Sequence, residues 1–132
     1  MPVYANLQSE AKLGGKLFNL QKISSKESLG LFKIHPDIPQ DYISFLTELG
    51  FGGLAQDSYM IYSGLMASDE IYDKESAEEL KNILFFGDDF MGYCSGFDTE
   101  NEWRIVEVDP IDKSYEVTHS SFSEFIQDLL ED

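Results

Sequence analysis

Carboxylates are the residues of this sequence with the most capacity for chemistry. The 132-residue chain has 25 Asp and Glu against nine Lys and Arg, so its formal net charge is −16 at pH 7. The charge balance is +3 over residues 1–36 and −19 over residues 37–132. Nucleic acids and anionic membranes are bound through basic residues, so this composition argues against both as direct partners. A basic protein is the expected complement.

One group of acids has a spacing that could bind calcium. Asp98, Glu100 and Glu102 alternate like the first three ligands of a calcium loop. An EF-hand also requires glycine at its sixth position and glutamate at its twelfth, where this chain has Trp103 and Asp109. The mismatch favours a solvated hairpin turn, and the sequence predicts no metal site.

The candidates for catalysis are few. Asp88 and Asp89 are adjacent, so a strand would direct them to opposite faces, and their residue type favours a turn. Cys94 lies in an aromatic stretch that is typical of a buried structural thiol. His35 and His119 are the two histidines, each beside turn or cap residues. We therefore predict no enzyme activity and no cofactor, with a small hydrolase using Cys94 or His119 as a remote alternative.

The compartment is predicted from segments that the sequence lacks. No stretch has the length and hydropathy of a signal peptide or a membrane span. The single cysteine, Cys94, cannot form an internal disulfide. These features predict a cytoplasmic protein.

The strongest predicted helix covers residues 38–50. Pro39 suits its first turn, Gly50 suits its C-terminal cap, and Gly52–Gly53 is predicted to continue the turn. Apolar residues recur three and four positions apart, which predicts one buried face. That face consists of Tyr42, Phe45, Leu46 and Leu49.

Two capping boxes predict the ends of further helices. Ser24 and Glu27 have the spacing that opens a short helix, which must end before Pro36. Ser121 and Glu124 have the same spacing and precede a strongly amphipathic C-terminal segment.

Short apolar segments joined by tight polar turns predict an antiparallel meander. The predicted strands are 59–62 (ending near Gly64), 83–86, 90–98, 103–109 and 114–118, with turns at 87–89, 99–102 and 110–113. The acidic stretch 68–81 is predicted to form one or two short helices over the sheet. We expect a single α+β domain over residues 1–132, in which an antiparallel β-meander sheet packs against N-terminal and C-terminal helices. Residues 1–24 show the least clear pattern.

Three segments, in order, resemble the SUKH superfamily of Smi/Knr-type domains. Residues 38–46 are similar to its Leu-Pro-x-Asp-Tyr-x-x-Phe-Leu helix, and the glycine-rich turn at 50–53 follows. Residues 86–98 resemble its two strands around a Gly-Asp turn, and residues 121–125 resemble the Ser-Phe-x-x-Phe opening of its closing helix. The resemblance covers residues 25–130.

The resemblance implies a non-enzymatic, protein-binding domain. Bacterial members typically neutralise a cognate toxin, often a nuclease or deaminase effector of a contact-dependent or polymorphic toxin system. We therefore predict an immunity protein, a monomer or weak homodimer, whose acidic surface binds a basic toxin domain. The alternative is a regulatory scaffold of the cell-wall-synthesis type, but fungal members bind through long flanking regions, of which this sequence has almost none.

The predicted partner contacts are acids in turns and in the helical insertion, where charge can point outward without disturbing a core. They are Asp69, Glu70, Asp73, Asp88, Asp89, Asp98, Glu100 and Glu102. Tyr59, Tyr62 and Trp103 are secondary candidates for apolar anchors, since rings bury area at low entropy cost. Core positions are favoured for Trp103, Tyr93 and Tyr115, with Tyr59 and Tyr62 left open. A solvated face or a host-wide adaptation to salt would also produce this acidity.

Overall fold

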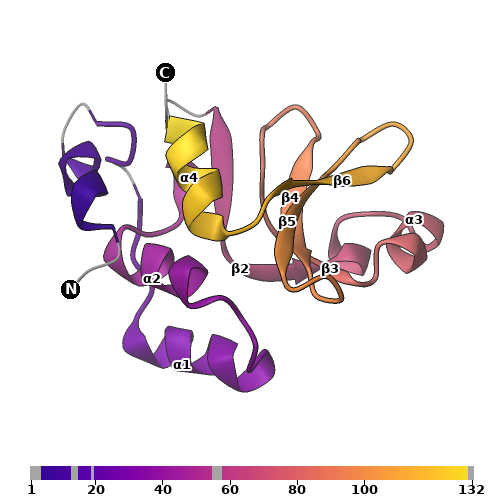
Figure 1. The fold of residues 1–132 in the computed structure, drawn as a ribbon, viewed down its shortest axis with the longest axis horizontal. Coiled ribbons are helices and arrows are strands. Elements are labelled where there is room, and N and C mark those ends of the chain that lie inside the picture. Colours follow the sequence, from indigo (N-terminus) through magenta and orange to yellow (C-terminus); the bar gives the residue numbers. More distant parts are fainter. Residues whose placement is uncertain (1–3, 13–14, 19, 55–57, 131–132) are drawn as a thin grey trace.

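The computed structural model describes residues 4–12, 15–18, 20–54 and 58–130. Its six strands form one antiparallel sheet in sequence order, β1 to β6, with helices before, within and after it (Figure 1). This arrangement confirms the predicted α+β meander. The elements are η1 (Ala5–Ala11), α1 (Ser25–Ile34), α2 (Gln40–Glu48), β1 (Gly52–Leu54), β2 (Tyr59–Ala67), η2 (Ser68–Glu70), α3 (Lys74–Glu79), β3 (Ile83–Asp88), β4 (Cys94–Asp98), β5 (Arg104–Val108), β6 (Tyr115–His119) and α4 (Phe122–Leu130).

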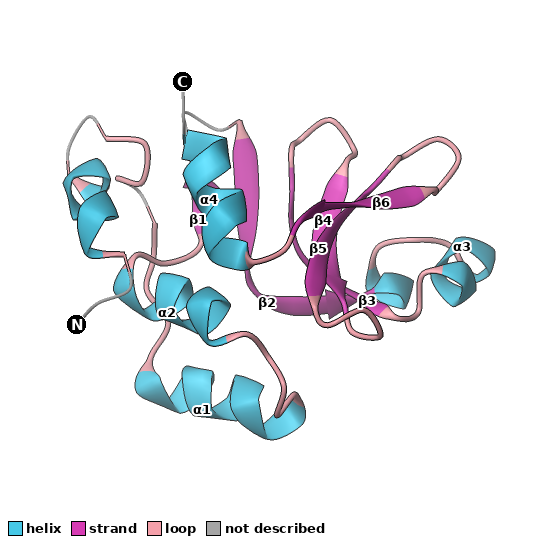
Figure 2. Cartoon of the chain, viewed as in Figure 1, coloured by secondary structure: helices cyan, strands magenta, loops and turns pink. Residues whose placement is uncertain are grey.

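The sheet buries side chains on both faces, because successive residues of a strand point to opposite sides. On β5, Ile105 belongs to a main core with α2 and α4, whereas Val106 and Val108 belong to a second core on the other face. The segment with η2 and α3 covers part of that second face through Leu80 (Figure 2). It confirms the predicted short helices over the sheet.

Aromatic rings fill the main core. Phe122 of α4 lies 5.1 Å from Tyr42 and 5.4 Å from Phe45, both on α2, measured between ring centroids. Phe86 of β3 lies 5.0 Å from Phe122. The predicted stripe of α2 is buried as expected. Pro39 lies just outside the helix as its N-cap residue, contrary to its predicted place in the first turn.

The N-terminal segment joins the same core, which its sequence pattern did not indicate. Tyr4 and Leu17 are each 1% exposed. The Tyr4 hydroxyl donates to the backbone carbonyl of Asp41 at 2.8 Å, and the Ile23 N–H donates to the Leu46 carbonyl at 3.1 Å. These contacts attach the segment to α2.

The two predicted capping boxes differ in the structure. At α1 both hydrogen bonds between Ser24 and Glu27 are present, which confirms the box. At α4 the Ser121 hydroxyl accepts from the Glu124 N–H at 3.2 Å, but the Glu124 carboxylate accepts from the Ser120 hydroxyl at 2.8 Å. The second box is therefore replaced by a cap that uses two serines.

Two glycine-containing segments predicted as turns lie in strands instead. Gly52–Gly53 pairs with β2 as part of β1, and Gly87 and Asp88 are the last residues of β3. A Cβ at Gly87 would lie 2.3 Å from the Met60 carbonyl oxygen of β2. Glycine is therefore required at this position because two strands approach each other closely. Glycine is also common in turns, so the residue type alone does not distinguish the two roles.

Two other predicted strands differ from the structure by several residues at one end. β2 continues past Gly64 to Ala67, and β4 begins at Cys94 and not at residue 90. Asp89 explains the second difference, because its carboxylate accepts the N–H groups of Met91 and Tyr93 at 2.8 and 3.1 Å. Those bonds hold the preceding segment in a loop and place Cys94 at the start of the strand.

Candidate functional site

Most of the predicted contact acids take part in local structure. Asp73 caps α3 by accepting the Ser76 N–H at 2.8 Å. In the turn after β4, Asp98 accepts the Glu100 N–H at 3.1 Å, and Glu102 pairs with Arg104 at 3.0 Å. The calcium-like spacing of this turn therefore forms a hairpin, as predicted.

The predicted acids do not form one patch. In a meander, consecutive turns lie at alternate ends of the sheet. The turn with Asp98, Glu100 and Glu102 thus lies at one end, and the loop with Asp88 and Asp89 lies at the other. Asp69, Glu70 and Asp73 lie on the helical insertion beside the second core.

The predicted aromatic anchors face the cores. Tyr59 is 4% exposed and its ring meets Phe125, so it offers no surface anchor. Tyr62 is partly buried, and its hydroxyl donates to Asp88 Oδ2 at 2.6 Å. Trp103 packs against the main core, 5.7 Å from Phe97.

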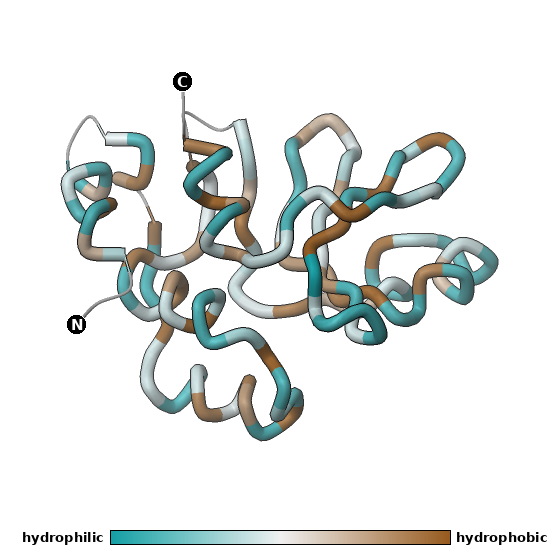
Figure 3. Tube along the Cα trace, in the orientation of Figure 1, coloured by the Kyte–Doolittle hydropathy of each residue, from teal (hydrophilic) through white to brown (hydrophobic). Residues whose placement is uncertain are grey.

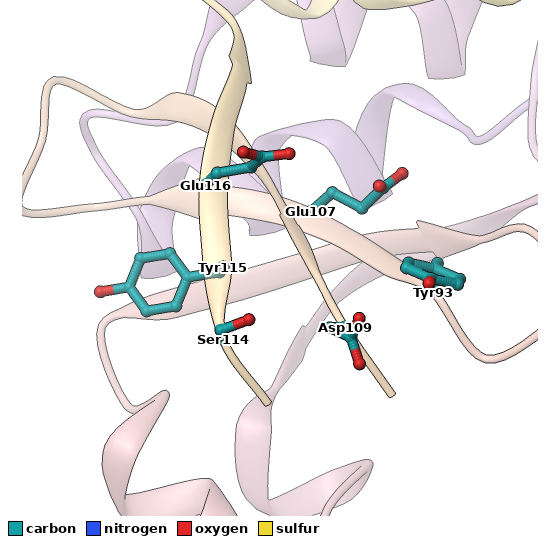
Figure 4. A pocket seen from close by; sticks show the side chains of 6 residues that line it. All are labelled: Tyr93, Glu107, Asp109, Ser114, Tyr115 and Glu116. Atoms are coloured by element: carbon teal, nitrogen blue, oxygen red, sulfur yellow. The ribbon is translucent and has the colours of Figure 1, made fainter. Parts of the chain in front are cut away.

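A different set of side chains forms an acidic groove at the end of β5 and β6. Its lining residues are Tyr93, Glu107, Asp109, Ser114, Tyr115 and Glu116, and its volume is about 240 Å³. Figure 4 shows the carboxylates of Glu107 and Glu116 on neighbouring strands, with the Tyr115 ring pointing away from them. We refer to these six residues as the acidic groove.

Two glutamates of the acidic groove are direct cross-strand neighbours. Glu107 of β5 is in register with Glu116 of β6. Partial burial, then the negative charges of Asp89 and Glu116, raise the pKa of the Glu107 carboxyl, which His119 partly offsets. Among the described residues, no Lys or Arg forms an ion pair with either glutamate.

Lys113, in the turn between β5 and β6, is directed away from the acidic groove. Lys113 Nζ donates to the Pro110 carbonyl and lies 5.7 Å from the centre of the Tyr72 ring. Tyr72 belongs to the second core, on the face opposite to Glu107. The local negative charge of the acidic groove therefore remains available to a partner.

Exposed apolar side chains lie on the two loops next to the acidic groove, and these loops touch each other. Met91 is 78% exposed and Ile111 is 90% exposed, and Phe90 is half exposed with φ of 65°. A Cβ on Gly92 would lie 3.0 Å from Pro110, which shows that the loops touch. Figure 3 shows apolar positions at the tips of both loops. We call Phe90, Met91 and Ile111 the apolar rim.

The sequence-based prediction missed the acidic groove because it selected acids in turns and in the helical insertion and left out the acids within predicted strands. Asp89 is the one predicted acid whose charge acts on Glu107. Tyr93 and Tyr115, predicted in the core, are 36% and 45% exposed. A usable signal existed, since a hairpin around the predicted turn at 110–113 places Glu107 opposite Glu116.

The environment of Cys94 disfavours its reactive form. Cys94 is buried, and burial raises the pKa of its thiol, which opposes the reactive thiolate. Within the described ranges, no three His, Cys, Asp or Glu residues are grouped so that they could hold a metal ion. None of the described helices is long and apolar enough to cross a membrane.

One protein-family model matches most of the chain. The model of the SUKH_6 family, described as SMI1-KNR4 cell-wall, matches residues 33–126. The chain belongs to the SUKH family. Its match spans α2, the whole meander and the first half of α4. No curated protein and no solved structure matched the chain. SUKH domains are generally non-catalytic, and the family includes immunity proteins.

Replacing Glu107 with Gln should stabilise this SUKH domain at pH 7 by a few tenths of a kcal/mol, within the range of about 0.2–1 kcal/mol for cross-strand pairs. Because the pKa of Glu107 is raised in the fold, its ionised form is disfavoured there. The cost appears as the pH rises above the pKa of the unfolded chain, and it is complete above the raised pKa of the folded protein. The gain in stability should disappear at about pH 3, because the Glu107 carboxyl is then protonated in both the folded and the unfolded protein.

The measurement is denaturant unfolding of wild type and E107Q at both pH values. Glu102→Gln is the matched control, because Glu102 is exposed and paired with Arg104. A loss of stability in E107Q at pH 7 would contradict the assigned repulsion.

Proposed function

We propose that this SUKH domain is a cytoplasmic immunity protein that binds a basic toxin domain through the acidic groove and the apolar rim. The observation that carries the proposal is the pair Glu107 and Glu116. Like charges directly opposite each other destabilise a sheet. Lys or Arg side chains of a basic partner would relieve this repulsion and attract both carboxylates.

The apolar rim supplies the other half of an interface. Exposed aromatic and methionine side chains are typical of protein-binding centres, whereas a charged border steers the encounter. Phe90 has positive φ, a backbone strain that often accompanies functional loops. A nuclease held here would have its phosphate-binding surface occupied by carboxylates.

A regulatory scaffold is the second candidate, and the cell-wall description of the matching family favours it. A scaffold would bind several signalling proteins, whereas an immunity protein would bind one toxin. The two candidates therefore differ in what they capture from a cell.

The test is affinity capture by the immobilised domain. A lysate of the host, mixed with a lysate of a toxin-producing strain, is applied at low salt, and bound proteins are eluted by a salt step. Wild type should retain a basic protein that the double variant E107Q/E116Q loses, with association about tenfold slower or more. The control variant E75Q/E79Q removes the same charge from the exposed side of α3 and should bind like wild type.

The captured protein is then expressed in cells with and without each variant. Rescue of growth by wild type and E75Q/E79Q, but not by E107Q/E116Q, supports immunity through the acidic groove. Capture of several unrelated signalling proteins supports the scaffold. Equal binding by all variants would contradict the assignment of this surface.

A further inference from the structure

Strand β6 is an open edge of the sheet. Within the described residues it pairs only with β5, and four of its five residues are exposed. The opposite edge, β1, has three residues, and next to it Gln21 pairs with Phe51. A free strand edge offers unpaired backbone donors and acceptors to another chain.

The register shows which backbone groups of β6 face outward. The Asp109 N–H donates to the Ser114 carbonyl at 2.8 Å, and hydrogen-bonded pairs then alternate along an antiparallel ladder. The backbone groups of Glu116 therefore face β5. Those of Tyr115 and Val117 face the open edge.

The side chains of β6 give its two faces different chemistry. Tyr115 and Val117 lie opposite Val108 and Val106 of the second core, so they extend that apolar surface to the edge. They are 45% and 48% exposed. Glu116 lies on the other face, where its carboxylate lines the acidic groove with that of Glu107.

We propose that β6 takes up an extended segment of the basic partner as a seventh, antiparallel strand. Its apolar side chains would cover Tyr115 and Val117, and its alternate Lys or Arg side chains would face Glu107 and Glu116. The inference rests on the proposed function and specifies its binding mode. Charge complementarity favours this occupant over a second copy, which would join two acidic grooves on one face of a continuous sheet.

The first test uses the wild-type protein and a capped peptide, Lys-Val-Lys-Val-Lys-Val-Lys, at low salt. Binding should protect the Tyr115 and Val117 amides from hydrogen exchange. In antiparallel pairing, residues that lie directly opposite each other share a face of the sheet. The peptide valines therefore lie opposite Tyr115 and Val117, and their backbone N–H groups point at β6. N-methylation of the valines should therefore weaken binding about tenfold or more, whereas N-methylation of the lysines should leave it nearly unchanged.

The second test changes the protein. Val117→Pro removes an edge N–H at a position where proline is compatible with a sheet, and should also lose about tenfold or more in peptide affinity. Val117→Ala keeps the N–H and should stay within about threefold of wild type. Circular dichroism checks that V117P folds, and the methylated peptides test the proposal independently if it does not.

Three results would overturn the edge pairing. The first is equal binding of both methylated peptides. The second is a wild-type dimer that V117P abolishes in sedimentation, which would assign the edge to a second copy. The third is failure of the peptide to bind. If the peptide fails to bind while a basic toxin is still lost by E107Q/E116Q, the proposed function holds and this binding mode is wrong.

Discussion

Replacing Phe45 with alanine is expected to lower the free energy of unfolding by about 3–5 kcal/mol. Phe45 is fully buried on α2. Its ring lies 5.4 Å from Tyr4 of the N-terminal segment and 5.4 Å from Phe122 of α4. The substitution would leave a cavity where three parts of the chain meet, and surrounding elements can close such a space only in part.

Urea denaturation of wild type and Phe45→Ala measures this loss. Leu29→Ala is the control, because Leu29 is 68% exposed on α1, and it should change stability by less than about 0.5 kcal/mol. A loss of under about 1 kcal/mol in Phe45→Ala would contradict the packing described here. Weaker partner binding by this variant would report folding and would not map the interface.

The second large effect is expected at Gly50, where alanine should cost about 3 kcal/mol or more. Gly50 has φ of 119°, a conformation that side chains disfavour. An added Cβ would also lie 2.5 Å from the Gln21 carbonyl oxygen. Gln21 and Phe51 exchange backbone hydrogen bonds of 3.0 and 2.9 Å, so a clash there would separate the N-terminal segment from the end of α2.

The matched control is the same substitution at Gly30. Gly30 lies within α1, and a Cβ there would meet nothing within 4 Å. Alanine should therefore stabilise the protein by about 0.5–1 kcal/mol through helix propensity. Thermal unfolding of both variants gives the comparison, and a Gly50→Ala protein as stable as wild type would contradict the tight contact with Gln21.

Local pattern was enough to predict α1, α2, α4, the helical insertion and the order of β2 to β6, but it predicted neither η1 nor β1. The stripe of α2 and the cap formed by Ser24 and Glu27 depend on neighbours three or four residues away, and the structure contains both as predicted. Strand limits were less predictable. Gly87 has the residue type of a turn, but its role depends on the Met60 carbonyl of another strand.

The N-terminal segment could not be placed from its own pattern. Tyr4 and Leu17 are buried because α2 and α4 are there to cover them, and neither helix is near them in sequence. Their burial is a property of the assembled core. No period in residues 1–24 encodes it.

The sequence by itself determined the charge, the SUKH resemblance and the α+β meander, since each depends on composition or short-range periodicity. Only the tertiary structure decided which acids act together. Glu107 and Glu116 come together through strand register, while Asp89 joins them because the loop after β3 lies at the same end of the sheet. Electrostatic potential depends on distance in space, and a linear sequence contains that distance only through its fold.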